Sequence, residues 1–306
     1  MAVDVIAERA VFHDIEASGI LNPFNKNNKL LDKNKVQNIL KKYGIFKNIN
    51  NLELYQEAMI HESYTKAHIS EICLRDNVTI VENPDGCVLL QNSSYERLEF
   101  LGDAILETII VSYLFNRFPD QSEGFLASLK VSLVNRNILA RLAKHIGLDE
   151  FIIMSKTLDD LQHARQDIKI LCDVFEAFIA AICIDFNSDR ISSSFLSGMG
   201  YQVAELFVIN LIEDESSRID ITQFILNDAN YKDQLVKYMK RTRQTTQPLE
   251  FKVVKAEGMG SHKEITINVI MRNGTTIEIL GRGISNTHKL AEQNASKDAL
   301  EKLGIL

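Results

Sequence analysis

The chain has 306 residues, of which 45% are hydrophobic and 25% are charged, with a net charge of −7. These values are ordinary for a globular protein, and the length suggests two domains. The sequence contains no run of eighteen or more apolar residues, so a membrane span is not expected. The first residues are acidic and lack a signal-peptide layout, and we therefore expect a soluble, cytoplasmic protein.

The four cysteines do not suggest a disulfide framework or a zinc site. None belongs to a CxxC pair, and the redox environment that we expect is reducing. Cys172 and Cys183 lie in an apolar helical stretch and are most simply buried free thiols.

The charge is unevenly distributed along the chain. Residues 230–306 contain 13 lysines and arginines against 8 aspartates and glutamates, a net +5, which leaves −12 for the rest. A basic C-terminal module could supply contacts to phosphates. An acidic body could hold divalent cations.

The first two thirds of the chain predict a helical domain. Residues 1–29 are weakly patterned and form an N-terminal extension, and residues 69–92 read as an insertion with two strands around an Asn83–Gly86 turn. From Tyr95 the helical period takes over, and Pro119 ends that helix. Further helices are predicted at 124–145, 170–186 and 198–213.

The last 75 residues or so change character. A helix at 231–241 precedes strands at 250–255, 265–270 and 276–280, the last two joined by an Asn-Gly turn, and a helix at 286–303 closes the chain. This is an α-β-β-β-α order. The predicted organisation is therefore an extension (1–29), a mainly helical domain (30–215, with insertion 69–92), a linker (216–229) and a small α+β domain (230–306).

Five carboxylates form two clusters on predicted helices. Glu96, Glu99 and Asp103 share one helical face, because they are spaced i, i+3 and i+7. Asp173 and Glu176 are the only charges in a thirteen-residue apolar stretch that should be buried. Acids on buried helices need partners, either in salt bridges or as metal ligands, and both interpretations stay open. Oxygen ligands would favour Mg²⁺ or Mn²⁺ and phosphoester hydrolysis.

The segment Glu96–Ala104, ERLEFLGDA, resembles the nine-residue signature of the ribonuclease III family. Asp173-Val174-Phe175-Glu176-Ala177 resembles its second metal-binding element, and Glu123 matches a further acidic position. The resemblance implies that Glu99, Asp103, Asp173 and Glu176 bind catalytic Mg²⁺, with Mn²⁺ able to substitute, and that Glu96 and Glu123 support RNA handling and hydrolysis. It also implies a homodimer in which Phe100 inserts into the partner. The pattern of the sequence alone would make Phe100 an ordinary core aromatic.

The C-terminal order resembles a double-stranded-RNA-binding domain. The match is weaker here, since His288 stands where the family has the first of two lysines. The candidate RNA contacts are Lys232, Ser261, His262, Arg282, His288 and Lys289. The pair Gly281-x-Gly283 lacks the third glycine of a dinucleotide loop, so no nucleotide cofactor is expected.

The resemblance implies an endoribonuclease that cuts double-stranded RNA and leaves 5′-phosphates with short 3′ overhangs. Two alternatives keep the fold without requiring cleavage: a non-catalytic duplex-RNA binder, and a protein that sequesters duplex RNA. Relatives that lose catalysis typically lose acidic positions, and all six are acidic here.

Overall fold

The structure is a computed structural model and describes residues 19–162, 164–187, 198–217, 219, 221, 231–243, 249–257, 264–273 and 276–305. Contacts divide the chain into two compact units, Met1–Phe224 and Ile225–Leu306. Residues 1–18 of the predicted extension and most of the predicted linker fall outside the described residues. None of the described helices combines the length and the hydropathy that crossing a bilayer requires.

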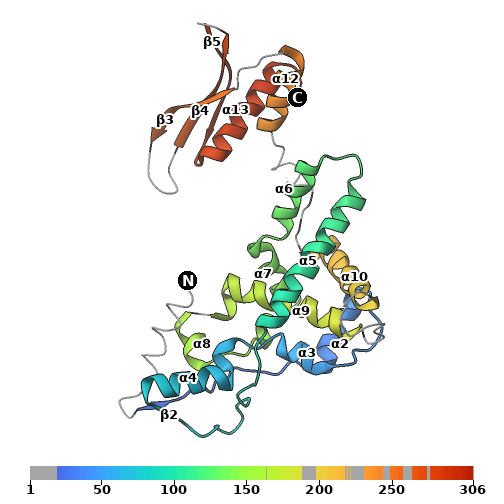
Figure 1. The fold of residues 1–306 in the computed structure, drawn as a ribbon, viewed down its shortest axis with the longest axis vertical. Coiled ribbons are helices and arrows are strands. Elements are labelled where there is room, and N and C mark those ends of the chain that lie inside the picture. The colour runs from blue at the N-terminus through green and yellow to red at the C-terminus, as the bar shows by residue number, and fades with distance from the viewer. Residues whose placement is uncertain are drawn as a thin grey trace. The chain divides into compact units, whose positions relative to one another are not determined.

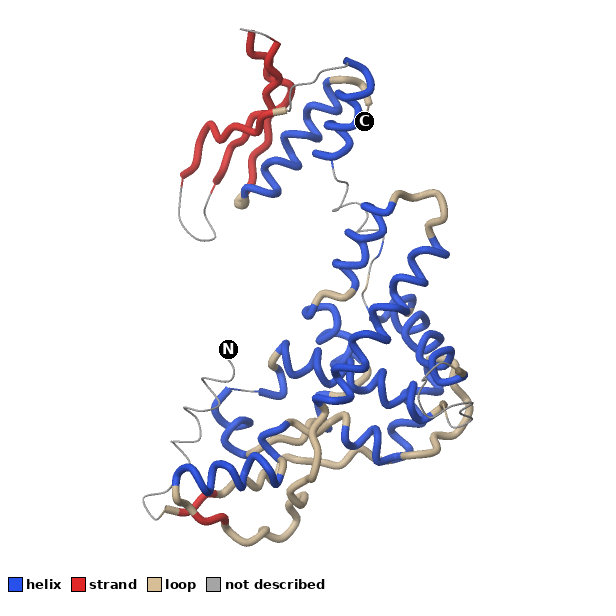
Figure 2. The backbone as a smooth tube through the Cα atoms, viewed as in Figure 1, coloured by secondary structure: helices blue, strands red, loops and turns tan. Residues whose placement is uncertain are grey.

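Where the structure describes it, the first unit is mainly helical, with two strands of two residues each (Figures 1 and 2). Its longer elements are α2 (Lys33–Lys42), α3 (Leu52–Glu57), α4 (Lys66–Asp76), α5 (Glu96–Arg117), α6 (Glu123–Leu133), α7 (Arg136–His145), α8 (Lys156–Gln162), α9 (Ile168–Asp185) and α10 (Met199–Glu213). The described residues of this unit also form four 3₁₀ turns: Glu62–Tyr64, Asp149–Phe151, Ala164–Gln166 and Glu215–Ser217. The mainly helical class predicted for this part is confirmed.

Helix α9 forms the centre of this unit. Every residue from Val174 to Cys183 is buried, including the large rings of Phe175 and Phe178, as an apolar sequence all round the helix predicts. Helices α5, α7 and α10 pack against it (Figure 1). Asp167 begins α9, since its side chain accepts hydrogen bonds from the backbone N–H groups of Lys169 and Ile170.

The crossing of α5 and α9 depends on Gly102. A Cβ atom at this position would lie 1.8 Å from the backbone oxygen of Glu176 and 2.5 Å from its carbonyl carbon. No side chain fits there, so only glycine permits the two helix backbones to approach so closely. The two carboxylate-bearing helices are thereby brought into contact.

The predicted helix at 124–145 is two helices. α6 ends at Leu133, and Asn135 begins α7 by accepting a hydrogen bond from the Asn137 backbone at 2.9 Å. An asparagine that caps the second helix ends the first, because its backbone is extended rather than helical. The apolar period alone did not reveal this break.

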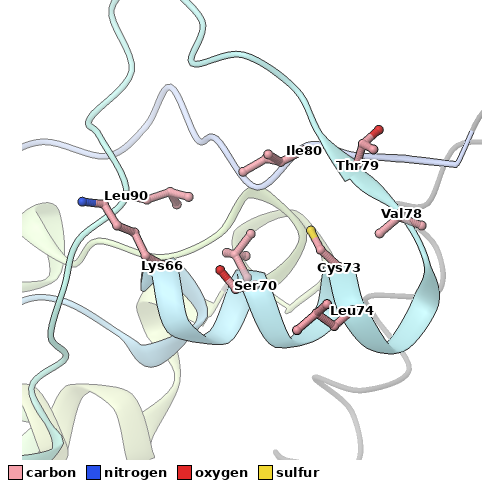
Figure 3. Close-up of a pocket in the computed structure, with 9 residues that line it drawn as sticks. Lys66, Ser70, Cys73, Leu74, Val78, Thr79, Ile80 and Leu90 are labelled. Carbon is pink, nitrogen blue, oxygen red and sulfur yellow. The ribbon is translucent and has the colours of Figure 1, made fainter.

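The hairpin predicted within 69–92 is wrong. Helix α4 extends to Asp76, and β2 (Thr79–Ile80) pairs in parallel with β1 (Ile20–Leu21). The Asn83–Gly86 sequence does form a turn, closed by a hydrogen bond from the Cys87 backbone to Pro84, but no second strand follows it. Figure 3 shows α4, β2 and Leu90 around a cavity of about 670 Å³.

The second unit has the predicted α-β-β-β-α order. It comprises α12 (Tyr231–Arg243), β3 (Glu250–Glu257), β4 (Glu264–Asn273), β5 (Thr276–Ser285) and α13 (His288–Lys302). The strands form an antiparallel sheet with β4 in the centre. A core of buried aliphatic side chains from α12, α13 and the sheet includes Leu235, Ile267 and Leu300.

Gly281 and Gly283 are packing residues of this second unit. A Cβ atom at Gly281 would lie 2.3 Å from the backbone oxygen of Ala295, and one at Gly283 would lie 2.2 Å from that of Ala291. The two glycines therefore let β5 lie against α13. This close packing is the structural reason for the Gly-x-Gly sequence.

We expect Gly102→Ala to destabilise the first unit by about 3 kcal/mol, because the added methyl group must push α5 and α9 apart. Chemical unfolding followed by circular dichroism measures this change. Gly124→Ala is the matched control, since a Cβ atom at this position on α6 meets nothing within 4 Å. That variant should be neutral or gain up to about 1 kcal/mol. Equal losses for both variants would refute the importance of the crossing.

Candidate functional site

The acidic residues of α5 lie near its N-terminus. Glu96 and Asp103 are exposed and Glu99 is half-buried. The Ser94 hydroxyl donates a hydrogen bond to Glu96 Oε2 at 3.0 Å. Negative side chains in the first turn are favourable because the helix dipole is positive at that end.

The acidic residues of α9 are more deeply placed. Glu176 is 7% exposed and Asp173 is half-buried. The Cys172 thiol donates a hydrogen bond to Glu176 Oε1 at 3.4 Å. One ligand atom from each of Cys172, Asp173 and Glu176 lies within 4.8 Å of the others, so this part of α9 forms a cluster able to hold a metal ion.

The carboxylates of the two helices influence one another. Burial raises the pKa of Glu176 to about 7, and repulsion from Asp103, Asp173 and Glu99 adds to this effect. Burial likewise raises the pKa of Asp173 to about 6, with Glu99 adding to it. Burial and then Asp103 raise the pKa of Glu99. The four predicted metal ligands therefore form one electrostatic cluster across the crossing of α5 and α9.

This cluster lacks a direct counter-charge. Lys169 and Arg136 are close enough to lower the pKa of Asp173. Within the described part of the chain, however, no cationic side chain forms an ion pair with Glu99, Asp103, Asp173 or Glu176. Of the two interpretations that the sequence left open, a salt bridge and a metal site, the geometry favours the metal site.

Glu123 is not part of the cluster within one chain. It is the exposed first residue of α6 and lines a cavity of about 470 Å³ with Val111 and Phe115 of α5. Those two residues follow Asp103 by 8 and 12 positions, which is roughly 12–18 Å along a helix. Lys130 of α6 pairs with Glu107 and with none of the clustered acids.

Phe100 is not a core residue in this chain. Its side chain is 80% exposed although it lies between buried positions of α5. Phe115 on the same helix is 68% exposed, and Val131 on α6 is 63% exposed. The expectation drawn from the sequence pattern alone is therefore wrong for Phe100.

His61 is a core histidine whose ring has a hydrogen-bond partner. It is buried, and its Nδ1 atom accepts a hydrogen bond from the Ser63 backbone at 3.1 Å. Burial lowers its pKa to about 4. The ring is therefore neutral at physiological pH and supports the loop rather than acting as a base.

The second unit presents some of its candidate RNA contacts to solvent. His288 and Lys289 are exposed in the first turn of α13, which Thr287 begins by accepting a hydrogen bond from Leu290. Arg282 is exposed on β5. The N-terminal turn of a helix with basic neighbours suits a phosphate group.

The other candidate RNA contacts are not shown as free, exposed side chains. Lys232 forms an ion pair with Glu292 at 2.7 Å and lies 4.3 Å above the centre of the Phe251 ring. Its charge is thus already partnered within the unit. Ser261 and His262 lie outside the described residues.

Two residues of the site were not predicted as such from the sequence: Gly102, and Cys172, which was expected only to be a buried free thiol. Cys172 precedes Glu176 by four positions, and residues so spaced on a helix are neighbours. That spacing could have identified the contact. No sequence signal identified Gly102 as the point where α5 meets α9.

Comparisons with known proteins agree with this geometry. Residues 96–187 match the model of the Ribonuclease III domain, and residues 231–303 match that of the Double-stranded RNA binding motif. The first match contains both acidic helices. The second contains the whole α-β-β-β-α unit.

Curated relatives extend the similarity over most of the chain. Ribonuclease 3 of Enterococcus faecalis is 30% identical and covers 89% of this chain and 99% of its own length. Probable ribonuclease 3 of Acanthamoeba polyphaga mimivirus is 31% identical over 96% of this chain, which spans 50% of that relative. The ribonuclease III nuclease domain of Campylobacter jejuni aligns with a TM-score of 0.44 at 26% identity, over 60% of this chain and 96% of that one.

We expect the buried Glu176 carboxylate to make metal-free stability depend on pH. Its folded pKa is about 7 and its ordinary value is 4.5. Stability from the protonated group is therefore fully present below pH 4.5 and lost as pH rises through about 7. In thermal unfolding with EDTA, Glu176→Gln should melt above wild type at pH 8 and converge with it near pH 4.5. The exposed Glu123→Gln serves as control, and a gap independent of pH would contradict the burial argument.

The residues matched by the two family models coincide with the structural features described above. The matched nuclease domain spans the crossing of α5 and α9, and the matched RNA-binding motif spans the second unit. The alignment with Ribonuclease 3 of Enterococcus faecalis spans 89% of this chain and 99% of that relative. The chain belongs to the ribonuclease III family and is an endoribonuclease specific for double-stranded RNA.

Proposed function

We propose that this chain cuts duplex RNA by hydrolysis at the acidic cluster of α5 and α9. Glu99, Asp103, Asp173 and Glu176 hold Mg²⁺, for which Mn²⁺ can substitute, since all four offer oxygen ligands. Divalent ions bound there supply the Lewis acidity that phosphodiester hydrolysis requires. The observation that carries the proposal is the buried Glu176 carboxylate next to the half-buried Asp173, both with raised pKa values and neither with an ion-pair partner among the described residues.

Glu96 and Glu123 have supporting roles in the proposal. Glu96 is exposed one turn before Glu99, where it is accessible to RNA and to solvent. Glu123, the first residue of α6, lies beside Val111 and Phe115 of α5 and is too far from Asp103 to share the cluster of its own chain. Its contribution is therefore to RNA handling. The expected products carry 5′-phosphates and short 3′ overhangs.

The second unit is proposed to hold the duplex. Arg282, His288 and Lys289 are exposed, and the last two lie in the first turn of α13. Basic side chains placed in this way contact phosphates on both sides of a groove, and they therefore recognise the shape of A-form RNA more than its sequence. Because Lys232 is already paired with Glu292, it contributes to the fold of the unit rather than to RNA.

We also propose that the protein acts as a homodimer through the exposed face of α5 and α6. Phe100, Phe115 and Val131 are large apolar side chains with most of their surface in solvent in the single chain. A partner subunit would remove this surface from water, at about 25 cal/mol per Å² of apolar area. Two acidic clusters would then serve the two strands of one duplex.

A protein that only binds or sequesters duplex RNA is not favoured. All six acidic positions of the family pattern are present, and the structure brings four of them into one cluster. A binding protein would gain nothing from burying Glu176 beside other acids, since a buried charge costs stability unless it is paired.

The first experiment is cleavage of a long, perfectly paired RNA with Mg²⁺, with EDTA and with the Glu176→Gln variant. We expect the wild type to cut only with the metal, and the variant to lose at least about a thousandfold in rate while binding the duplex with wild-type salt dependence. Gel analysis of end-labelled RNA follows both steps. Binding without cleavage by the wild type under every divalent ion tried would refute the catalytic assignment.

Phe100→Glu tests the proposed dimer. Analytical ultracentrifugation should show a monomer for this variant, because a carboxylate at the interface centre would be buried without a partner. Phe46→Glu is the matched control, since Phe46 is 75% exposed but lies in the segment between α2 and α3 and not on α5 or α6. A dimeric Phe100→Glu protein, or a monomeric wild type that cuts duplex RNA at full rate, would rule out this interface.

A further inference from the structure

The acidic cluster contains a sulfur atom for which hydrolysis with Mg²⁺ has no use. Cys172 is 3% exposed, lies one turn before Glu176, and directs its thiol to that carboxylate at 3.4 Å. Hard ions such as Mg²⁺ take oxygen ligands, whereas thiolate sulfur selects softer metals.

The spacing of the ligand atoms suits a tetrahedral ion. Zinc bonds of about 2.3 Å to sulfur and about 2.1 Å to a carboxylate oxygen, at a tetrahedral angle, place the two ligand atoms about 3.6 Å apart. The thiol and the nearer oxygen of Glu176 are 3.4 Å apart, and Asp173 supplies an oxygen within 4.8 Å of both. Three donor atoms of this kind can therefore converge on one ion with little rearrangement.

A second observation, the environment of the Glu176 carboxylate, also indicates a cation-binding site. Glu176 is 7% exposed, and within the described residues it forms no ion pair with a lysine, an arginine or a histidine. Among the described residues its side chain accepts a hydrogen bond only from the Cys172 thiol. A buried carboxylate in this environment is stabilised by whichever cation enters.

We propose that Cys172, Asp173 and Glu176 form a capture site for thiophilic divalent ions, Zn²⁺ or Cd²⁺, which compete with the catalytic ion. On binding, the S–H bond of Cys172 breaks, the metal–sulfur bond forms, and the proton passes to solvent, so that one proton is released per ion. Asp173 and Glu176 are then withdrawn from Mg²⁺, and cleavage stops. The competition rests on the proposed function, whereas the capture of the ion does not.

Cd²⁺ alone is the probe, because a cadmium–thiolate bond produces an ultraviolet charge-transfer absorption. The full-length wild type, Cys172→Ala, Cys172→Ser and Cys183→Ala are titrated and compared. Cys183 is the matched control, since it lies buried on the same helix, α9, and the metal-ligand cluster does not include it. The signals of Cys73 and Cys87 are common to all four proteins and cancel in the comparison.

We expect the wild type and Cys183→Ala to show one charge-transfer band more than the two Cys172 variants. Cd²⁺ inhibition of Mg²⁺-supported cleavage, normalised to each protein's own uninhibited rate, should weaken at least roughly tenfold in the Cys172 variants. Cys172→Ser carries the same test if the alanine variant does not fold.

Two results would overturn the proposal: a band of equal intensity in Cys172→Ala and Cys183→Ala, or equal Cd²⁺ sensitivity in both. Failure of the proposed function is distinguishable from these. In that case the wild type would not cut RNA with Mg²⁺, while the band dependent on Cys172 would still be present.

Discussion

The contact between Gly102 and the backbone of Glu176 is the constraint on which the site depends. It brings two helix backbones closer together than any side chain would permit. Helix α5 carries Glu99 and Asp103 on either side of this contact, and α9 carries Asp173 and Glu176. The crossing therefore brings together two pairs of carboxylates that are about seventy residues apart in the chain. Their mutual repulsion is a direct consequence of this geometry.

The surrounding core supplies the free energy that holds these charges together. Phe175, Phe178 and the aliphatic residues of α9 are fully buried, and each large apolar side chain contributes about 1.5–3 kcal/mol relative to exposure. Glu176 lies where α9 meets Gly102 of α5, and Asp173 lies one turn before it. A site that opposes folding in this way is typical of a position where a ligand completes the structure. Cys172 adds a sulfur donor beside these carboxylate oxygens. In our proposal, the site therefore binds thiophilic ions as well as Mg²⁺.

The second unit uses a similar device for a different purpose. Gly281 and Gly283 let β5 lie against α13 without intervening side chains. This packing fixes the helix whose first turn carries His288 and Lys289. His288 and Lys289 therefore lie on a helix that is packed closely against the sheet, whereas Lys232 forms an ion pair within the unit. Both units thus position charged groups through glycine contacts between backbones.

Much about this protein was determined by the sequence itself. Helical periodicity and the apolar stretch around Asp173 were enough for the helical fold class and for five of the six acidic candidates, because these depend on local spacing. The family and the sixth candidate, Glu123, came from the resemblance of the ERLEFLGDA segment and its flanking sequence to ribonuclease III. Only the tertiary structure decided that Glu123 lies apart from the other acids, that Phe100 is exposed and that Lys232 is already paired. It also replaced the expected hairpin with a strand that pairs with residues about sixty positions earlier. These features depend on contacts between segments distant in the chain, and no local pattern encodes which segments will meet.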